Sequence, residues 1–167
     1  MKVLKWIDEH FEEYLLVFLL VMIACVMMLQ IIMRYVFKAS LSWAEELTRY
    51  CFVWSVFLSI SFSIKKGSML KIDAITSLMP KKMQKVLSIL VEIIVFIFLL
   101  ILLINSKEVI TRLIKSGQTS PAMELPMYYV YAASIVGFSL GVIRSIQSIV
   151  KSTIKLFKDK SNQLGVS

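Results

Sequence analysis

The sequence contains few of the residues from which metal, haem or disulfide sites are built. It has one histidine, His10, and two cysteines, Cys25 and Cys51, which lie in or beside apolar runs and form no CxxC pair. A haem held between two histidines of this chain is therefore excluded, and little is left for a zinc site. We expect no cofactor in this chain. We also expect no enzyme activity, because no nucleophile–base pair or metal set accompanies its polar motifs.

Charged residues are also scarce, and the apolar residues are gathered into runs. Charged residues make up 18% and hydrophobic residues 58% of the 167 residues, whereas a soluble domain is about 25% charged and about 45–50% apolar. The pattern predicts an integral membrane protein surrounded by membrane lipids. The net charge is +8, but the lysines flank the apolar runs, so no nucleic-acid partner is expected. The N-terminus lacks a signal-peptide cleavage site, so we expect the first span to be retained.

The apolar runs predict an all-α integral membrane protein with four transmembrane helices, each about 20 residues long. The second run, 50–64, is too short unless its helix begins earlier. The sequence Ser42-Trp43-Ala44-Glu45 has the form of a capping box, in which Glu45 reaches back to the helix start. We expect one four-helix membrane domain, residues 1–160, with spans at about 14–36, 43–64, 84–106 and 126–146, a basic amphipathic interfacial helix at about 146–158, and a disordered tail at 161–167.

The lysines and arginines predict the orientation of the spans. With both termini in the cytoplasm, thirteen of these residues lie on the cytoplasmic side and six on the outer side. Cytoplasmic loops carry such an excess. We therefore expect both termini inside and the start of the second span at the outer face. The third helix can run to Lys115 and stop at Gly117, because glycine is favoured just past a helix end.

A polar cluster lies where the second span begins. Glu45 and Glu46 stand four and three residues before Arg49, spacings at which ion pairs form along one helix face. Arg34 closes the first span at the same membrane face and can join them. Two interpretations stay open. The cluster braces the first two helices, or it is a docking edge for a membrane or periplasmic partner.

Two helix faces consist of small residues at steps of four, and these allow close approach between helices. They pack within this chain or against another subunit. Their members are Ser55, Ser59 and Ser63 on the second helix, and Ala133, Gly137 and Gly141 on the fourth.

Glu92 is the one acid well inside an apolar run. Intramembrane acids are candidates for function. Glu92 has either a structural or subunit-pairing role, or a role in ion or proton coupling. The second role would suit an autonomous small exporter or channel, assembled as a homo-oligomer. A membrane anchor for a redox enzyme is a third hypothesis, against which the missing histidine pair argues when haem is the cofactor.

An ordered series of motifs resembles the small membrane subunit (DctQ-like) of tripartite ATP-independent periplasmic, or TRAP, transporters. The first span ends in RYVF at 34–37, and SWAEELTRYCFVWSVFL follows at 42–58. KIDAI at 71–75 and Pro80 come next, and GQTSPAMELPMYYVY at 117–131 is followed by Gly137 and Arg144. The similarity covers about residues 10–147.

This resemblance implies a partnership in the bacterial inner membrane. A large membrane subunit is expected to carry sodium ions and an organic acid, such as a C4-dicarboxylate or sialic acid. A periplasmic substrate-binding protein is expected to deliver the acid. This multi-pass chain would be a scaffold beside the large subunit that helps to seat the binding protein. Subunit-interface or docking roles, without substrate contact, follow for the matching residues Arg34, Tyr35, Trp43, Glu45, Glu46, Arg49, Gln118, Ser120, Pro121 and Pro126.

Overall fold

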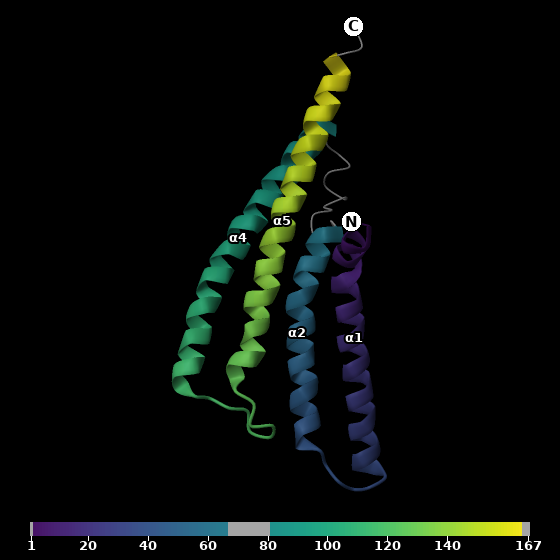
Figure 1. Cartoon of the computed structure of the whole chain (residues 1–167), viewed down its shortest axis with the longest axis vertical. Helices are drawn as coiled ribbons and strands as arrows, with labels where there is room; N and C mark the ends of the chain where they lie inside the picture. The colour runs from purple at the N-terminus through teal and green to yellow at the C-terminus, as the bar shows by residue number, and fades with distance from the viewer. Residues whose placement is uncertain (1, 67–80, 165–167) are drawn as a thin grey trace.

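A computed structural model describes residues 2–66 and 81–164 of the chain, which form four long helices (Figure 1). These are α1 (Lys2–Tyr35), α2 (Ser42–Lys66), α4 (Lys81–Ser116) and α5 (Met127–Leu164). Each contains a segment that is long and apolar enough to cross a membrane. The expectation of an all-α membrane protein with four spans is confirmed. The KIDAI motif and Pro80 lie outside the described residues.

The helices lie side by side in one row, in the order α1, α2, α5, α4 (Figure 1). α2 packs against α1 and α5, and α5 packs against α4. The helices at the two edges of the row each have one main neighbour among the described elements, so their side chains are largely uncovered. Phe18 on α1 is 60% exposed and Ile104 on α4 is 66% exposed. In a membrane, lipid or another protein must cover these apolar surfaces.

The helix ends follow from local sequence. α2 begins at Ser42, as the need for a longer second helix predicts. α4 ends at Ser116, and Gly117 follows with a φ of 63°, a left-handed conformation that glycine adopts without steric cost. α5 differs from the expectation, because it continues without a break through 146–158 and through residues 161–164 of the expected tail. The basic segment is therefore a continuation of the fourth helix.

The tightest helix contact joins α5 to α2. A Cβ atom on Gly137 would lie 2.7 Å from the Cβ of Phe57 and would also meet the Phe57 backbone, so only glycine allows this approach. The Phe57 and Phe138 rings meet edge to face with centroids 5.3 Å apart. Gly141 lies beside Leu99 of α4, and Ala133 is fully buried. The small-residue face of α5 thus packs within the chain.

The serine face of α2 meets α1. Ser55 and Ser59 line a shallow groove with Leu16, Val17 and Leu20. Their hydroxyls donate hydrogen bonds to backbone carbonyls of α2, and Ser63 is half-buried. Polar groups that are satisfied within their own helix leave a surface that is compatible with apolar neighbours.

The row has two distinct ends (Figure 1). At one end, which we call the loop end, residues 36–41 connect α1 to α2 and residues 117–126 connect α4 to α5. At the other, the termini end, α1 begins and α5 ends. Polar side chains gather at both ends.

Candidate functional site

At the loop end, Glu46 of α2 holds the connection between α4 and α5. Its carboxylate accepts hydrogen bonds from the Ser120 hydroxyl at 2.7 Å and from the backbone amides of Ala122 and Met123 at 3.1 and 3.0 Å. Ser120 is buried. We call this the Glu46 clamp. A carboxylate with three donors aimed at it fixes the position of the loop that supplies them.

The clamped loop is a compact hairpin, residues 117–126. The Ser120 amide donates to the Leu125 carbonyl at 2.9 Å, and the Met127 amide donates to the Gln118 carbonyl at 2.9 Å. Thr119 and Pro126 form an isolated antiparallel bridge. The side chains of Gln118 and Pro121 are exposed, and Pro126 is half-buried at the start of α5. The hairpin therefore presents a fixed outer surface.

Glu45 connects α2 to α1. Its Oε1 accepts a hydrogen bond from the Gln30 side-chain amide at 2.7 Å, and Gln30 is 8% exposed. The expected reach of Glu45 back to the start of its own helix is not seen among the described residues. A buried amide on α1 has a strong demand for an acceptor, which explains why the carboxylate turns toward it.

The two arginines at this end are not paired as their spacing predicted. Arg34 and Arg49 are exposed, and among the described side chains neither has an ion-pair or hydrogen-bond partner. The expected Glu45–Arg49 and Glu46–Arg49 ion pairs are absent because both carboxylates are engaged elsewhere. Instead, the two arginines line a groove of about 530 Å³ between α1 and α2. We call it the arginine groove.

Two aromatic residues complete the loop end. Tyr35 is 76% exposed and also lines the arginine groove, and Trp43 is 37% exposed at the start of α2. Aromatic residues of this kind concentrate where a membrane meets water. The structure thus places all ten residues of the proposed docking set at the loop end, on the hairpin or on the adjoining ends of α1 and α2. Gln30 also joins this group, although sequence reasoning did not assign it a role.

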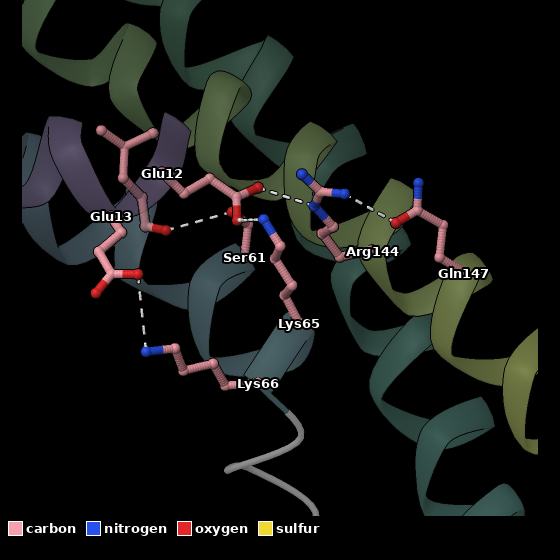
Figure 2. Close-up of polar contacts among 8 residues, drawn as sticks. Glu12, Glu13, Ser61, Lys65, Lys66, Arg144 and Gln147 are labelled. Carbon is pink, nitrogen blue, oxygen red and sulfur yellow. Dashed lines mark hydrogen bonds and ion pairs between the residues drawn. The ribbon is translucent and has the colours of Figure 1, made fainter. Parts of the chain in front are cut away.

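At the termini end, Glu12 joins three helices (Figure 2). Its Oε1 accepts a hydrogen bond from Arg144 Nε of α5 at 2.9 Å, and its Oε2 lies 3.5 Å from Lys65 Nζ of α2. Glu12 is 2% exposed and Arg144 is 8% exposed. Arg144 also donates to the Gln147 side chain at 2.9 Å. We call this the Glu12 clamp.

A weaker ion pair lies beside this clamp. Oε2 of Glu13 lies 3.9 Å from Nζ of Lys66, and both side chains are about half exposed (Figure 2). Because water screens this pair, it contributes little to stability. Glu12 therefore connects three helices through buried contacts, whereas its neighbour Glu13 makes one half-exposed ion pair.

Glu92 joins α4 to α5. Its Oε1 accepts hydrogen bonds from the hydroxyls of Ser148 and Ser152 at 3.0 and 2.9 Å, and its side chain is buried. The two serines are four residues apart and so lie on one face of α5. This contact places Glu92 in a helix-joining position within the chain.

Sequence reasoning missed the Glu12 clamp and the serine partners of Glu92. Signals were present: an acid at the start of the first span, an arginine at the end of the fourth, and two serines at helical spacing. Nothing in the sequence alone indicated which of these residues meet. Among the described residues, no group of three or more histidine, cysteine, aspartate or glutamate side chains is placed to hold a metal ion.

Comparison with known proteins agrees with this architecture. The family model described as "Tripartite ATP-independent periplasmic transporters, DctQ component" matches residues 22–154. The chain is 29% identical over 153 residues to the isethionate TRAP transporter permease protein DctMQ of Oleidesulfovibrio alaskensis, with 88% of this chain and 24% of that protein covered.

Two further relatives belong to transporters of other acids. The chain is 36% identical over 94 residues to the sialic acid TRAP transporter permease protein SiaT of Haemophilus influenzae, with 56% of this chain and 15% of that protein covered. It is 28% identical over 98 residues to the C4-dicarboxylate TRAP transporter small permease protein DctQ of Vibrio cholerae, with 59% of this chain and 42% of that protein covered. The chain thus spans less than half the length of each of these relatives.

Proposed function

The chain belongs to the DctQ component family of tripartite ATP-independent periplasmic transporters, as a multi-pass small permease subunit of the bacterial inner membrane, and from that membership we propose that it is a scaffold for a large membrane subunit. The large subunit would carry the substrate together with sodium ions. The substrate would be an organic acid of the C4-dicarboxylate or sialic acid type, in keeping with the names of two relatives.

The observation that carries this proposal is that the buried acids contact side chains of neighbouring helices within the chain. Oε1 of Glu12 and Oε1 of Glu92 each accept hydrogen bonds from side chains of a neighbouring helix, and Lys65 lies beside Oε2 of Glu12. Oε2 of Glu92 is buried without a hydrogen-bond partner among the described residues. A transporter subunit that moves cargo needs polar groups left available near the middle of the membrane, usually at broken helices. Here the polar groups join continuous helices into a row. Such a row suits a rigid support whose apolar surfaces are covered by lipid and by a partner.

The loop end suits a second task, which is to help dock the periplasmic substrate-binding protein. The excess of lysine and arginine on the opposite side supports a periplasmic position for the loop end. The Glu46 clamp holds the hairpin in one conformation, and Gln118 and Pro121 are exposed on it. A docking surface that is already ordered loses less conformational entropy on binding.

Reconstitution tests the scaffold role. Proteoliposomes that contain this chain alone should take up no organic acid, whereas addition of its large-subunit and binding-protein partners should give sodium-dependent uptake. Uptake by this chain alone would instead support the autonomous transporter hypothesis, with Glu92 as the coupling acid.

Photo-crosslinking tests the docking role. A photoreactive residue at position 118, on the hairpin, should capture the binding protein. A matched probe at position 108 lies on an exposed site near the same end of α4 and should capture little. Equal capture at both positions, or capture only at 108, would contradict docking at the hairpin.

A further inference from the structure

We propose that the arginine groove binds an anionic phospholipid, with its phosphate at Arg34 and Arg49 and an acyl chain along α1. The groove lies between α1 and α2 at the loop end, and both arginines line it. Among the described side chains, neither makes a hydrogen bond or a close ion pair, although the charge of Arg49 also acts on Glu46 of the same helix. This inference requires only that the chain is in a membrane, and it does not depend on the scaffold role.

The depth of Arg49 creates the demand for an anion. Arg49 is seven residues after the first residue of α2, about 10 Å along the helix axis. An arginine at that depth is costly unless it is paired or reaches the interface. Glu45, the acid that lines the same groove, already accepts from Gln30. Two arginines and one glutamate therefore line the groove, and the glutamate is already hydrogen-bonded to Gln30. A phosphate group can accept paired hydrogen bonds from a guanidinium group.

The rest of the groove is lined by apolar side chains, which suit the acyl chain of a lipid. Its lining continues along α1 from Tyr35 down to Ile23, about 18 Å of helix. Met27 and Ile31 on α1 and Phe52 on α2 line this lower part and are 42%, 55% and 59% exposed. The groove is thus charged at the loop end and apolar below, which is the pattern of a phospholipid.

A lipid fits this groove better than a carboxylate from a partner protein. An acidic side chain would pair with the arginines but would leave the apolar part of the groove bare. A lipid of the surrounding leaflet fills both parts at once and enters sideways from the bilayer. Displacement of the lipid by a partner's acid is one outcome of the experiment below.

Native mass spectrometry of the detergent-purified chain tests the proposal, with dioleoylphosphatidylglycerol as the anionic probe and dioleoylphosphatidylcholine as the zwitterionic control. The wild-type chain should retain one phosphatidylglycerol about tenfold more tightly than phosphatidylcholine. Both phosphates can accept charge-assisted hydrogen bonds, but the quaternary ammonium of phosphatidylcholine offsets the attraction of its phosphate to the two arginines. The Arg34→Ala/Arg49→Ala variant should lose that preference. Arg112→Ala is the matched control, because Arg112 is an exposed arginine near the loop end of α4 that already pairs with Glu108.

A second variant separates the acyl chain from the head group. Met27→Trp fills the apolar part without changing charge, and it should weaken retention of both lipids while the helical circular dichroism spectrum stays unchanged. The proposal fails if Arg112→Ala lowers retention as much as the double variant, or if inorganic phosphate competes as well as the lipid. It also fails if the retained lipid disappears when the large subunit is bound, since a protein acid would then be the partner.

Discussion

Replacement of Glu12 by glutamine should weaken the packing of the first two helices against α5 more than removal of any other acidic charge in the described part of the chain. The change keeps the side chain's size and removes its charge. Arg144 would keep its position at 8% exposure without the carboxylate that Nε now contacts at 2.9 Å. Loss of one partner of a buried ion pair typically costs about 3–5 kcal/mol, because the remaining charge is left unpaired.

The structure indicates that the cost of Glu12→Gln lies in the lower part of the range for a broken buried ion pair. Lys65 is less buried than Arg144, with 19% of its side chain exposed, and its flexible stem can carry the ammonium group toward water. Arg144 keeps its hydrogen bond to Gln147. We therefore expect Glu12→Gln to lower the free energy of unfolding by about 3 kcal/mol. Unfolding in mixed micelles with increasing dodecyl sulfate, followed by circular dichroism, measures this change.

The neighbouring acid provides the control. Glu13→Gln removes the same charge one residue further along α1, but it breaks only a half-exposed pair at 3.9 Å. Its cost should be about 0–1 kcal/mol. A double variant, Glu12→Gln with Arg144→Met, should recover part of the lost stability, because no buried guanidinium then lacks the Glu12 carboxylate. If Glu12→Gln and Glu13→Gln were equally mild, the buried ion pair would not be holding the helices.

Two further predictions concern helix contact and the hairpin. Gly137→Ala should destabilise the chain by about 1–2 kcal/mol, since the new methyl group meets α2 backbone. The methyl group of Gly141→Ala would meet only side-chain methyl groups, those of Leu99 at 3.3 Å and of Ile60 and Ile64 at 3.6 and 3.7 Å, so this variant should be neutral or slightly stabilising in the same titration. Glu46→Ala should speed amide hydrogen exchange at Ala122 and Met123 about tenfold, because both amides lose their acceptor. Glu45→Ala should leave that exchange unchanged, and equal acceleration by both would contradict the Glu46 clamp.

The elements of this fold were readable from the sequence because each depends on local rules. Hydrophobic length gave the four spans, and the need for a longer second helix placed the start of α2 near Ser42. The preference of glycine for a left-handed conformation placed the end of α4 at Gly117. The uninterrupted extension of α5 was not predicted, because a basic amphipathic segment has the same periodicity whether it is a separate helix or a continuation.

The partners of the charged residues were not readable, because they depend on which helices are neighbours. Spacing along one helix favoured Glu45 and Glu46 as partners of Arg49, yet each acid is engaged across the fold. Glu46 and Ser120 are 74 residues apart, and Glu12 and Arg144 are 132 apart. The carboxylates accept from Gln30 on α1 and from donors in the hairpin, because these groups need an acceptor within the packed structure, whereas an exposed arginine can still reach water.

The long separation within the Glu12 clamp has a consequence for biogenesis. During synthesis the first helix enters the bilayer before its arginine partner on the last helix has been made. Until that last helix is inserted and lies beside α2, Glu12 lacks the cation that it contacts most closely. Insertion of α5 and pairing of Glu12 with its nearest cation thus coincide, so a chain in which α5 is absent or inserted in the wrong direction leaves Glu12 with Lys65 as its cation.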